Sequence, residues 1–207
     1  MKNVRELNKV ADEALKSAKS VVDALVDPQS FVESDRFIRS ATALGEATGE
    51  GVVSGFATVS DVQVGVFAIS GDILKGSIGK ANAKKIAKCV NNAIKTDSPV
   101  IGVIDTQGAR FAEGIEAMEG YGEIFAAFSS AYGVVPTILV VKGSNYGLTS
   151  YLSSVCDFTI CYDKSVTATS SPLILVAGTT ADAAKVGTGE AMAKTGIASV
   201  TVKSDKE

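Results

Sequence analysis

The segment Pro99-Val-Ile-Gly-Val-Ile-Asp-Thr-Gln-Gly-Ala-Arg110 decides the fold class of this 207-residue chain. Its first part, 99–104, is short and almost wholly apolar, which is typical of a parallel strand in a sheet that is covered on both faces. A glycine-containing turn follows at once, and apolar residues at helical spacing come after it. A buried strand, a tight turn and a helix in this order indicate an α/β fold.

The sequence on both sides continues this alternation. Upstream, two β-branched runs separated by Ser60-Asp61 predict a β-hairpin. The ranges expected as strands are 51–59, 62–69, 99–104, 134–141, 157–162 and 166–168. The ranges expected as helices are 81–95, 115–128, a short one ending at 155, and 172–176. Strands that alternate with helices predict parallel pairing through right-handed crossovers.

The first residues have a different pattern. Residues 4–25 carry apolar side chains at helical spacing opposite a charged face, so we expect one amphipathic helix that ends at Asp27-Pro28. The segment 31–48 is polar and mixed. We therefore divide the chain into an N-terminal helix with its lead-in, 1–48, and a main domain, 49–207. The charged residues from about Thr201 onward are expected to fray.

Composition excludes several classes of function. The net charge of −3 lacks the basic excess of nucleic-acid-binding surfaces. No apolar run is long enough to span a membrane, and the charged first residues lack a secretory signal. The 3 cysteines without a C-x-x-C pair indicate reduced thiols in a cytoplasmic protein. With 0 histidines we expect no metal site and no Ser-His-Asp triad, so catalysis depends on other side chains, backbone dipoles or a cofactor.

Glycine-containing turns follow the strands of the predicted sheet at 74–79, 106–110 and 143–147. Ligands of α/β folds gather at the carboxyl ends of the strands, where we expect these turns to lie together. Each precedes a predicted helix and can present free N–H groups to an oxyanion. The alternative is that the glycines only permit tight turns. The spacing leaves both open and names no substrate.

Several motifs occur here in the order in which one family carries them. The segment 99–114 is similar to an apolar strand followed by Asp-Ser-Gly-Gly-Ala-Arg-x-x-Glu-Gly. The segment 49–59 resembles that family's first strand, and 75–86 resembles its Gly-Gly-Ser loop and following helix. Shorter matches lie at 25–33, 120–121, 133–136 and 156–159. The chain thus resembles the N-terminal half of carboxyltransferase subunits of biotin-dependent acyl-CoA carboxylases and decarboxylases.

The resemblance implies a crotonase-like (ClpP/crotonase) β-β-α spiral that binds an acyl-CoA. The implied reaction transfers a carboxyl group between carboxybiotin and an acyl-CoA through an oxyanion-stabilised enolate. The cofactor would be biotin on a separate carrier protein, with a coenzyme A thioester as the substrate. The implied partners are a carboxyltransferase C-half subunit, the biotin carboxyl carrier protein and a biotin carboxylase or decarboxylase component, in an oligomer.

The resemblance also assigns site residues. It places the enolate oxygen at the N–H groups of Gly108 and Ala109. It places the coenzyme A entrance at Gly76, Ser77 and Gly79, and the thioester with its pantetheine arm beside Gly143, Tyr146 and Gly147. Arg110 is a candidate contact for a coenzyme A phosphate, although we favour a tie to a neighbouring carboxylate or carbonyl. A basic cluster of Lys75, Lys80, Lys84 and Lys85 either attracts those phosphates or forms a solvated face.

The chain departs from the family's pattern at the same turns. Gln107 replaces the first of two glycines, and Tyr146 and Leu148 replace small residues near the expected acyl pocket. Two alternatives therefore stay open. The chain is a catalytically degenerate, structural subunit of such a complex, or it is a crotonase-type hydratase or hydrolase that uses Glu113 and Glu116 as an acid/base pair.

Overall fold

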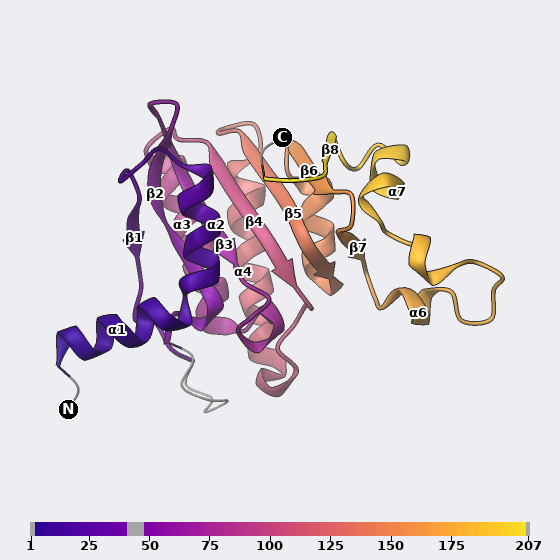
Figure 1. Cartoon of the computed structure of the whole chain (residues 1–207), viewed down its shortest axis with the longest axis horizontal. Coiled ribbons are helices and arrows are strands. Elements are labelled where there is room, and N and C mark those ends of the chain that lie inside the picture. Colours follow the sequence, from indigo (N-terminus) through magenta and orange to yellow (C-terminus); the bar gives the residue numbers. More distant parts are fainter. Residues whose placement is uncertain (1–2, 41–47, 206–207) are drawn as a thin grey trace.

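The computed structural model describes residues 3–40 and 48–205. Its centre is an 8-stranded sheet with the order β1-β2-β3-β4-β5-β6-β8, in which β7 pairs with β5 (Figure 1). The strands are β1 Val32–Ser34, β2 Val52–Val59, β3 Val62–Ile69, β4 Val100–Thr106, β5 Thr137–Tyr146, β6 Phe158–Tyr162, β7 Val166–Ala168 and β8 Val200–Val202. The β2–β3 hairpin is antiparallel and β3 to β6 pair in parallel, which confirms the predicted topology.

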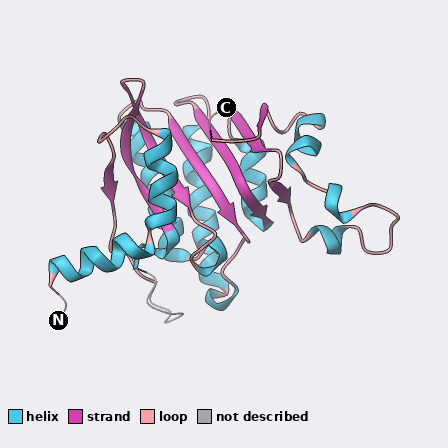
Figure 2. Ribbon diagram, viewed as in Figure 1, coloured by secondary structure: helices cyan, strands magenta, loops and turns pink. Residues whose placement is uncertain are grey.

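Helices cover both faces of this sheet, as Figure 2 shows. The α-helices are α1 Val4–Ala14, α2 Lys16–Leu25, α3 Lys80–Lys95, α4 Ile115–Ala131, α5 Leu152–Val155, α6 Pro172–Leu175 and α7 Gly189–Lys194. Short 3-10 turns lie at Thr48–Gly51, Leu74–Gly76, Phe111–Glu113, Gly147–Tyr151 and Ala183–Lys185. Within residues 3–40 and 48–205, no helix combines the length and the apolar character that a bilayer crossing needs.

Strand alternation divides the interior into two apolar cores. Phe67 and Leu139 point to the face that α3 and α4 cover, and Phe67 meets Phe128 edge to face at 6.3 Å between ring centroids. Val66, the residue before Phe67 on β3, and Val103 of β4 point to the opposite face, where they form the second core together with Val22 of α2. Because side chains of a strand alternate between faces, the apolar runs at 62–69 and 99–104 fill both cores at once. Burial of β4 on both sides was predicted and is confirmed.

The structure differs from the expected elements at the N-terminus. The expected helix over 4–25 is two helices, because Leu15 leaves the helical conformation with φ −101° and ψ 6°. The Leu15 side chain is 2% exposed and packs against Gly49, where an added Cβ would lie 2.6 Å from it. Residues 41–47 of the expected lead-in lie outside the described residues. The domain division at residue 48 stays a prediction.

The C-terminal part also differs from the expectation. β5 continues to Tyr146 through the expected turn at 143–147, because Ser144 to Tyr146 pair with β7. The expected fraying from Thr201 is wrong for Thr201 and Val202, because both residues pair with β6. Neither β1 nor α7 was predicted from the sequence.

Candidate functional site

The first two glycine turns are joined by backbone hydrogen bonds. The Gln107 N–H donates to the Lys75 carbonyl at 3.0 Å, and the Ile78 N–H donates to the Gly108 carbonyl at 2.8 Å. These bonds hold the turn after β3 against the turn after β4. The predicted gathering of turns at one sheet edge is therefore confirmed for this pair.

The segment after β5 joins the same edge. Thr106 at the end of β4 pairs with Asn145 of β5. A Cβ added to Gly147 would lie 3.7 Å from the Gly108 Cα, and one added to Gly108 would lie 3.0 Å from the Tyr146 carbonyl oxygen. Gly108 also has φ +98°, a region that L side chains rarely adopt. Glycine at 108 is thus required by its conformation and by the close approach of the two turns.

The five consecutive N–H groups from Gly76 to Lys80, at the first turn, all have acceptors inside the protein. The expectation of free donors is therefore wrong for these residues. The acceptors are Ile73 O for Gly76, Leu74 O for Ser77, Gly108 O for Ile78, Asn82 Oδ1 for Gly79 and Glu113 Oε2 for Lys80.

In the second turn, the N–H group of Ala109 has no acceptor in the part of the chain that the structure describes. The Gly108 N–H donates to Thr106 Oγ1 at 3.0 Å, and this hydroxyl donates to the Gly76 carbonyl at 2.7 Å. The Ala109 N–H, in contrast, has no acceptor among residues 3–40 and 48–205. Of the two donors that the resemblance assigns, only Ala109 is thus available for a ligand in this structure.

The pairing of Ala109 with Ile78 explains why this N–H stays free. The two residues form an isolated parallel bridge. Ile78 uses its own N–H and carbonyl in that bridge, toward Gly108 and Arg110. In a parallel bridge of this kind the N–H and carbonyl of the opposite residue point away from the partner. The half-buried Ala109 therefore directs its N–H away from the first turn.

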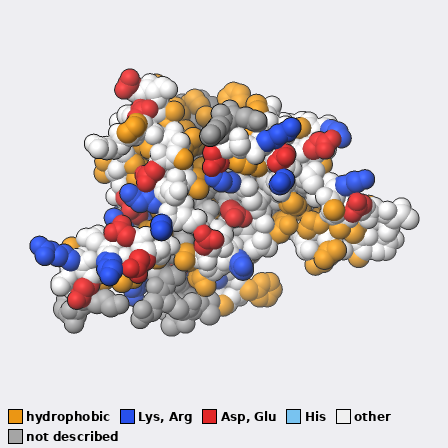
Figure 3. Space-filling view, in the orientation of Figure 1, with side chains coloured by type: hydrophobic (Ala, Val, Ile, Leu, Met, Phe, Trp, Pro, Cys, Tyr) orange, Lys and Arg blue, Asp and Glu red, His pale blue; other side chains and the backbone are white. Residues whose placement is uncertain are grey.

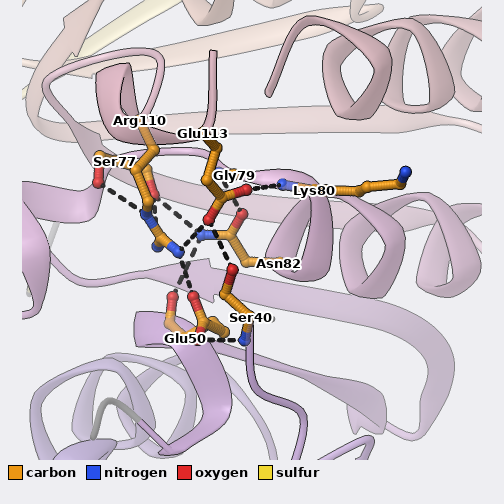
Figure 4. Close-up of polar contacts among 8 residues, drawn as sticks. All are labelled: Ser40, Glu50, Ser77, Gly79, Lys80, Asn82, Arg110 and Glu113. Atoms are coloured by element: carbon orange, nitrogen blue, oxygen red, sulfur yellow. Dashed lines mark hydrogen bonds and ion pairs between the residues drawn. The ribbon is translucent and has the colours of Figure 1, made fainter. Parts of the chain in front are cut away.

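Arg110 lies in a buried ionic cluster (Figure 4). Its guanidinium is 5% exposed, forms an ion pair with Glu50 and lies 2.9 Å from Glu113 Oε1. It also donates to the Ser77 carbonyl at 3.1 Å. These contacts confirm the favoured tie to carboxylates. Arg110 is therefore committed inside the protein rather than available to a phosphate.

Glu113 is committed in the same way. It accepts hydrogen bonds from the Ser40 hydroxyl at 2.9 Å and from the Lys80 N–H at 2.7 Å. Burial alone would raise the pKa of Glu113, but these hydrogen bonds and that from Arg110 lower it on balance. Glu116 instead lies half exposed, 3.9 Å from the Lys80 ammonium. Glu113 is thus held by buried hydrogen bonds while Glu116 lies at the surface near a lysine ammonium, so the two carboxylates do not form an acid/base pair.

The expected basic cluster is divided between surface and interior. Lys75 is exposed, Lys80 pairs with Glu119 at 2.9 Å, and Lys84 lies 3.9 Å from Glu123. Lys85 was expected on a solvated face or facing the coenzyme A phosphates, and this is wrong. The residue is 1% exposed and its ammonium donates to the Val52 carbonyl at 2.6 Å. Burial lowers the pKa of Lys85 to about 8, against the opposing field of Glu33. The four lysines do not form one surface.

The remaining predicted positions make contacts within the protein at the carboxyl end of the sheet. A Cβ on Gly143 would lie 2.4 Å from Asp105 Oδ1, so Gly143 makes room for a carboxylate of the protein itself. The Gln107 side chain, absent from the family's pattern, donates to Ser144 Oγ at 3.0 Å. Leu148 is half-buried and packs against the apolar core. Sequence reasoning missed Thr106, although it lies inside the quoted motif and its hydroxyl joins two turns.

Curated proteins similar to this chain include subunits of an acyl-CoA carboxylase and of an acyl-CoA decarboxylase. The chain is 36% identical over 154 residues to the propionyl-CoA carboxylase beta chain of Saccharopolyspora erythraea, covering 72% of this chain and 28% of that protein. It is 37% identical over 150 residues to the human mitochondrial propionyl-CoA carboxylase beta chain, with 69% and 28% covered. It is 36% identical over 147 residues to the methylmalonyl-CoA decarboxylase subunit alpha of Veillonella parvula, with 69% and 29% covered. The chain therefore spans less than a third of the length of these relatives.

Solved structures share the fold. The crystal structure of transcarboxylase 12S, described as a hexamer with methylmalonyl-coenzyme A and methylmalonic acid bound, superposes with a TM-score of 0.89 at 26% identity. The alignment covers 97% of this chain and 43% of that one. A Pseudomonas malonate decarboxylase hetero-tetramer gives a TM-score of 0.83 at 20% identity, with 91% and 76% covered, which bears on the fold alone. The expected crotonase-like α/β fold is confirmed.

The sequence profile of the carboxyl transferase domain matches most of the chain. It extends over residues 13–207 and includes every turn of the candidate site. The resemblance that the motifs indicated is thereby confirmed across most of the chain: this protein belongs to the carboxyl transferase domain family.

Proposed function

We propose that this chain is the acyl-CoA-binding part of a biotin-dependent carboxyltransferase, which moves a carboxyl group between carboxybiotin and an acyl-CoA. The observation that carries the proposal is the Ala109 N–H just after β4, which has no acceptor among the described residues and lies at the carboxyl end of the strand, where α/β folds bind their ligands. In the transfer, the thioester passes through an enolate whose charge falls on the former carbonyl oxygen. A fixed N–H aimed at that oxygen stabilises it without reorganisation during the reaction.

The residues of this chain hold the donor in place. The bridge to Ile78 fixes Ala109, and the Thr106 hydroxyl fixes Gly108 beside it. Glu113 is committed to internal hydrogen bonds and does not act as the base. Biotin on a separate carrier protein would supply the carboxyl group and, after releasing it, the base. A reaction in which the cofactor supplies the base needs no histidine in this chain, which agrees with its 0 histidines.

Exposed apolar side chains support completion of the site by other subunits. Phe111 is 97% exposed and Ile115 is 82% exposed, directly after the Ala109 turn. Hydrophobic side chains also gather over the projecting segment that contains α6 (Figure 3). We propose that a carboxyltransferase C-half subunit covers such surfaces. A biotin carboxyl carrier protein and a biotin carboxylase or decarboxylase component would complete the oligomer.

The test is a transfer assay of the chain co-expressed with its partner subunit, following malonyl-CoA-dependent carboxylation of biocytin. Ala109→Pro removes the N–H without breaking an internal hydrogen bond of the described residues. We expect it to lower kcat by about 100- to 1000-fold, the usual cost of one oxyanion donor. Ala109→Gly keeps the N–H and should stay within about threefold of the wild type, because no donor is lost. Full activity in the folded proline variant would refute the site assignment.

A structural, non-catalytic role is the second candidate. It is favoured by the Gly108 N–H, which is already used by Thr106, so one donor remains where two were expected. Titration of the chain with acetyl-CoA separates the two candidates. Saturable binding that Ala109→Pro weakens supports the carboxyltransferase, and a folded chain that binds no thioester supports the structural subunit.

A further inference from the structure

A hollow of about 70 Å³ lies between α2 and the sheet, on the face opposite α3 and α4. Its wall is apolar on one side and polar on the other. The apolar lining residues are Val21, Ala24 and Leu25 of α2 with Val103 and Val140 of the sheet, and the polar ones are Lys142, Tyr162 and Asp205. None of these residues belongs to the candidate site at the Ala109 turn.

Strand alternation explains why these side chains meet. Val140 and Lys142 are two positions apart on β5, so they face the same side of the sheet. Tyr162 of β6 faces that side as well, whereas its neighbour Cys161 packs into the opposite core. Figure 1 shows α2 in front of the sheet and no helix in front of β5 and β6. The hollow is thus lined by α2 on one side and by β4, β5 and β6 on the other.

The polar side of the hollow already holds a carboxylate. The Lys142 ammonium donates to both oxygens of Asp205, at 2.8 and 3.0 Å, and the Tyr162 hydroxyl donates to one of them. Hydrogen bonds from Lys142 and Tyr162 lower the pKa of Asp205. Burial, with a further contribution from Asp205, raises the pKa of Tyr162 to about 12. At neutral pH the phenol is thus a donor, which suits an anionic partner.

We propose that this hollow is a binding site for short-chain carboxylates, whose alkyl group enters the apolar part while the carboxylate replaces that of Asp205 between Lys142 and Tyr162. The volume admits a few water-sized groups, which fits the two or three carbons beyond the carboxylate of propionate or butyrate. The Asp205 side chain is 54% exposed, and exposed ion pairs are weak, so it acts as an internal competitor that a ligand can displace.

Calorimetric titration of the full chain with butyrate tests this site. Asp205→Ala removes the competitor and should bind butyrate at least tenfold more tightly than the wild type. Adding Lys142→Met to that variant should abolish binding, because the cation is lost. Adding Ala24→Leu should weaken binding at least tenfold, because the new side chain fills the apolar part. Butylamine should not bind, since it presents a cation to Lys142.

Methyl NMR of Val21 and Val140 provides a second readout that does not depend on any one variant folding. Butyrate should shift both methyl signals in Asp205→Ala. Absence of saturable binding in folded Asp205→Ala would overturn the proposal. Equal affinity of the wild type and Asp205→Ala for butyrate would also overturn it. So would unchanged butyrate binding after Ala24→Leu is added to Asp205→Ala. Val140→Ile is a second substitution that fills the apolar part, for use if the Ala24→Leu variant does not fold. The outcome is independent of thioester binding at Ala109.

Discussion

The turn at 75–80 and the turn at 106–110 look alike in sequence, since each carries glycine just before a helix, but their N–H groups differ in availability. In the first turn every N–H from Gly76 to Lys80 has an internal acceptor. In the second, the N–H of Ala109 has none among the described residues. Glycine therefore marks where the chain turns tightly, whereas contacts from distant segments decide which turn can receive a ligand.

The largest effect is expected from breaking the ionic cluster that closes the first turn. Arg110→Met leaves Glu50 and Glu113 buried without their cation, with side chains 4% and 1% exposed. Removing one partner of a buried ion pair costs about 3–5 kcal/mol of folding free energy. Urea unfolding monitored by circular dichroism measures this loss.

A surface ion pair of the same region is the control. Lys80→Ala removes the contact with Glu119, whose side chain is 56% exposed, and should change the unfolding free energy far less than Arg110→Met, because solvent screens exposed ion pairs. Equal effects of the two substitutions would show that the cluster does not lock the turn.

The next effect concerns another buried charge, Lys85 of α3. Because burial lowers the pKa of Lys85 from 10.5 to about 8, the folded state binds fewer protons than the unfolded state between these values. The stability contributed by Lys85 should therefore be constant below pH 8 and rise with pH from 8 to 10.5. At about 1.4 kcal/mol per pH unit the rise is on the order of 3 kcal/mol.

The measurement is the difference in unfolding free energy between the wild type and Lys85→Met across this pH range. The variant lacks the titrating group, so other groups cancel in the difference. A difference that stays flat from pH 8 to 10.5 would contradict the burial of a charged Lys85.

A smaller effect is expected from the packing of the first turn. Gly79→Ala places a Cβ within 2.4–2.6 Å of the Glu113 carboxylate, although φ at this position is an ordinary −113°. Such overpacking costs about 1–3 kcal/mol. Gly122→Ala is the matched control, because nothing lies within 4 Å of its Cβ in α4, and it should stabilise the chain by about 0.5–1 kcal/mol. Thermal unfolding distinguishes the two, and equal shifts in Tm would contradict the close contact.

The elements that local patterns determine were predictable from the sequence. The hairpin at 52–69, the apolar β4 and the helices α3 and α4 have clear periodicity and lie close to their expected bounds. β1 and β8 were missed, because each is only a short segment whose strand conformation depends on pairing with β2 or β6. The break at Leu15 depends on packing against Gly49, which no local pattern indicates.

The candidate site was predictable in place but not in detail. The gathering of glycine turns follows from strand topology, and the structure shows it. The occupation of the Gly108 N–H depends on the rotamer of Thr106, and the burial of Lys85 depends on the position of β2. Both are long-range features, so charge and spacing along the chain do not reveal them.

The central claim is that the Ala109 N–H receives the oxygen of a coenzyme A thioester. Amide NMR of the ¹⁵N-labelled chain tests it most directly, by titration with acetyl-CoA and, as a control, with free coenzyme A, which lacks the acyl oxygen. The account predicts that the Ala109 amide exchanges quickly with solvent in the free chain. On addition of acetyl-CoA, but not of free coenzyme A, the Ala109 amide proton signal should move downfield and its exchange with solvent should slow. The amide signals of Gly76 and Gly79 should stay unchanged. An Ala109 amide that is protected without ligand, or that does not respond when acetyl-CoA binds, would contradict it.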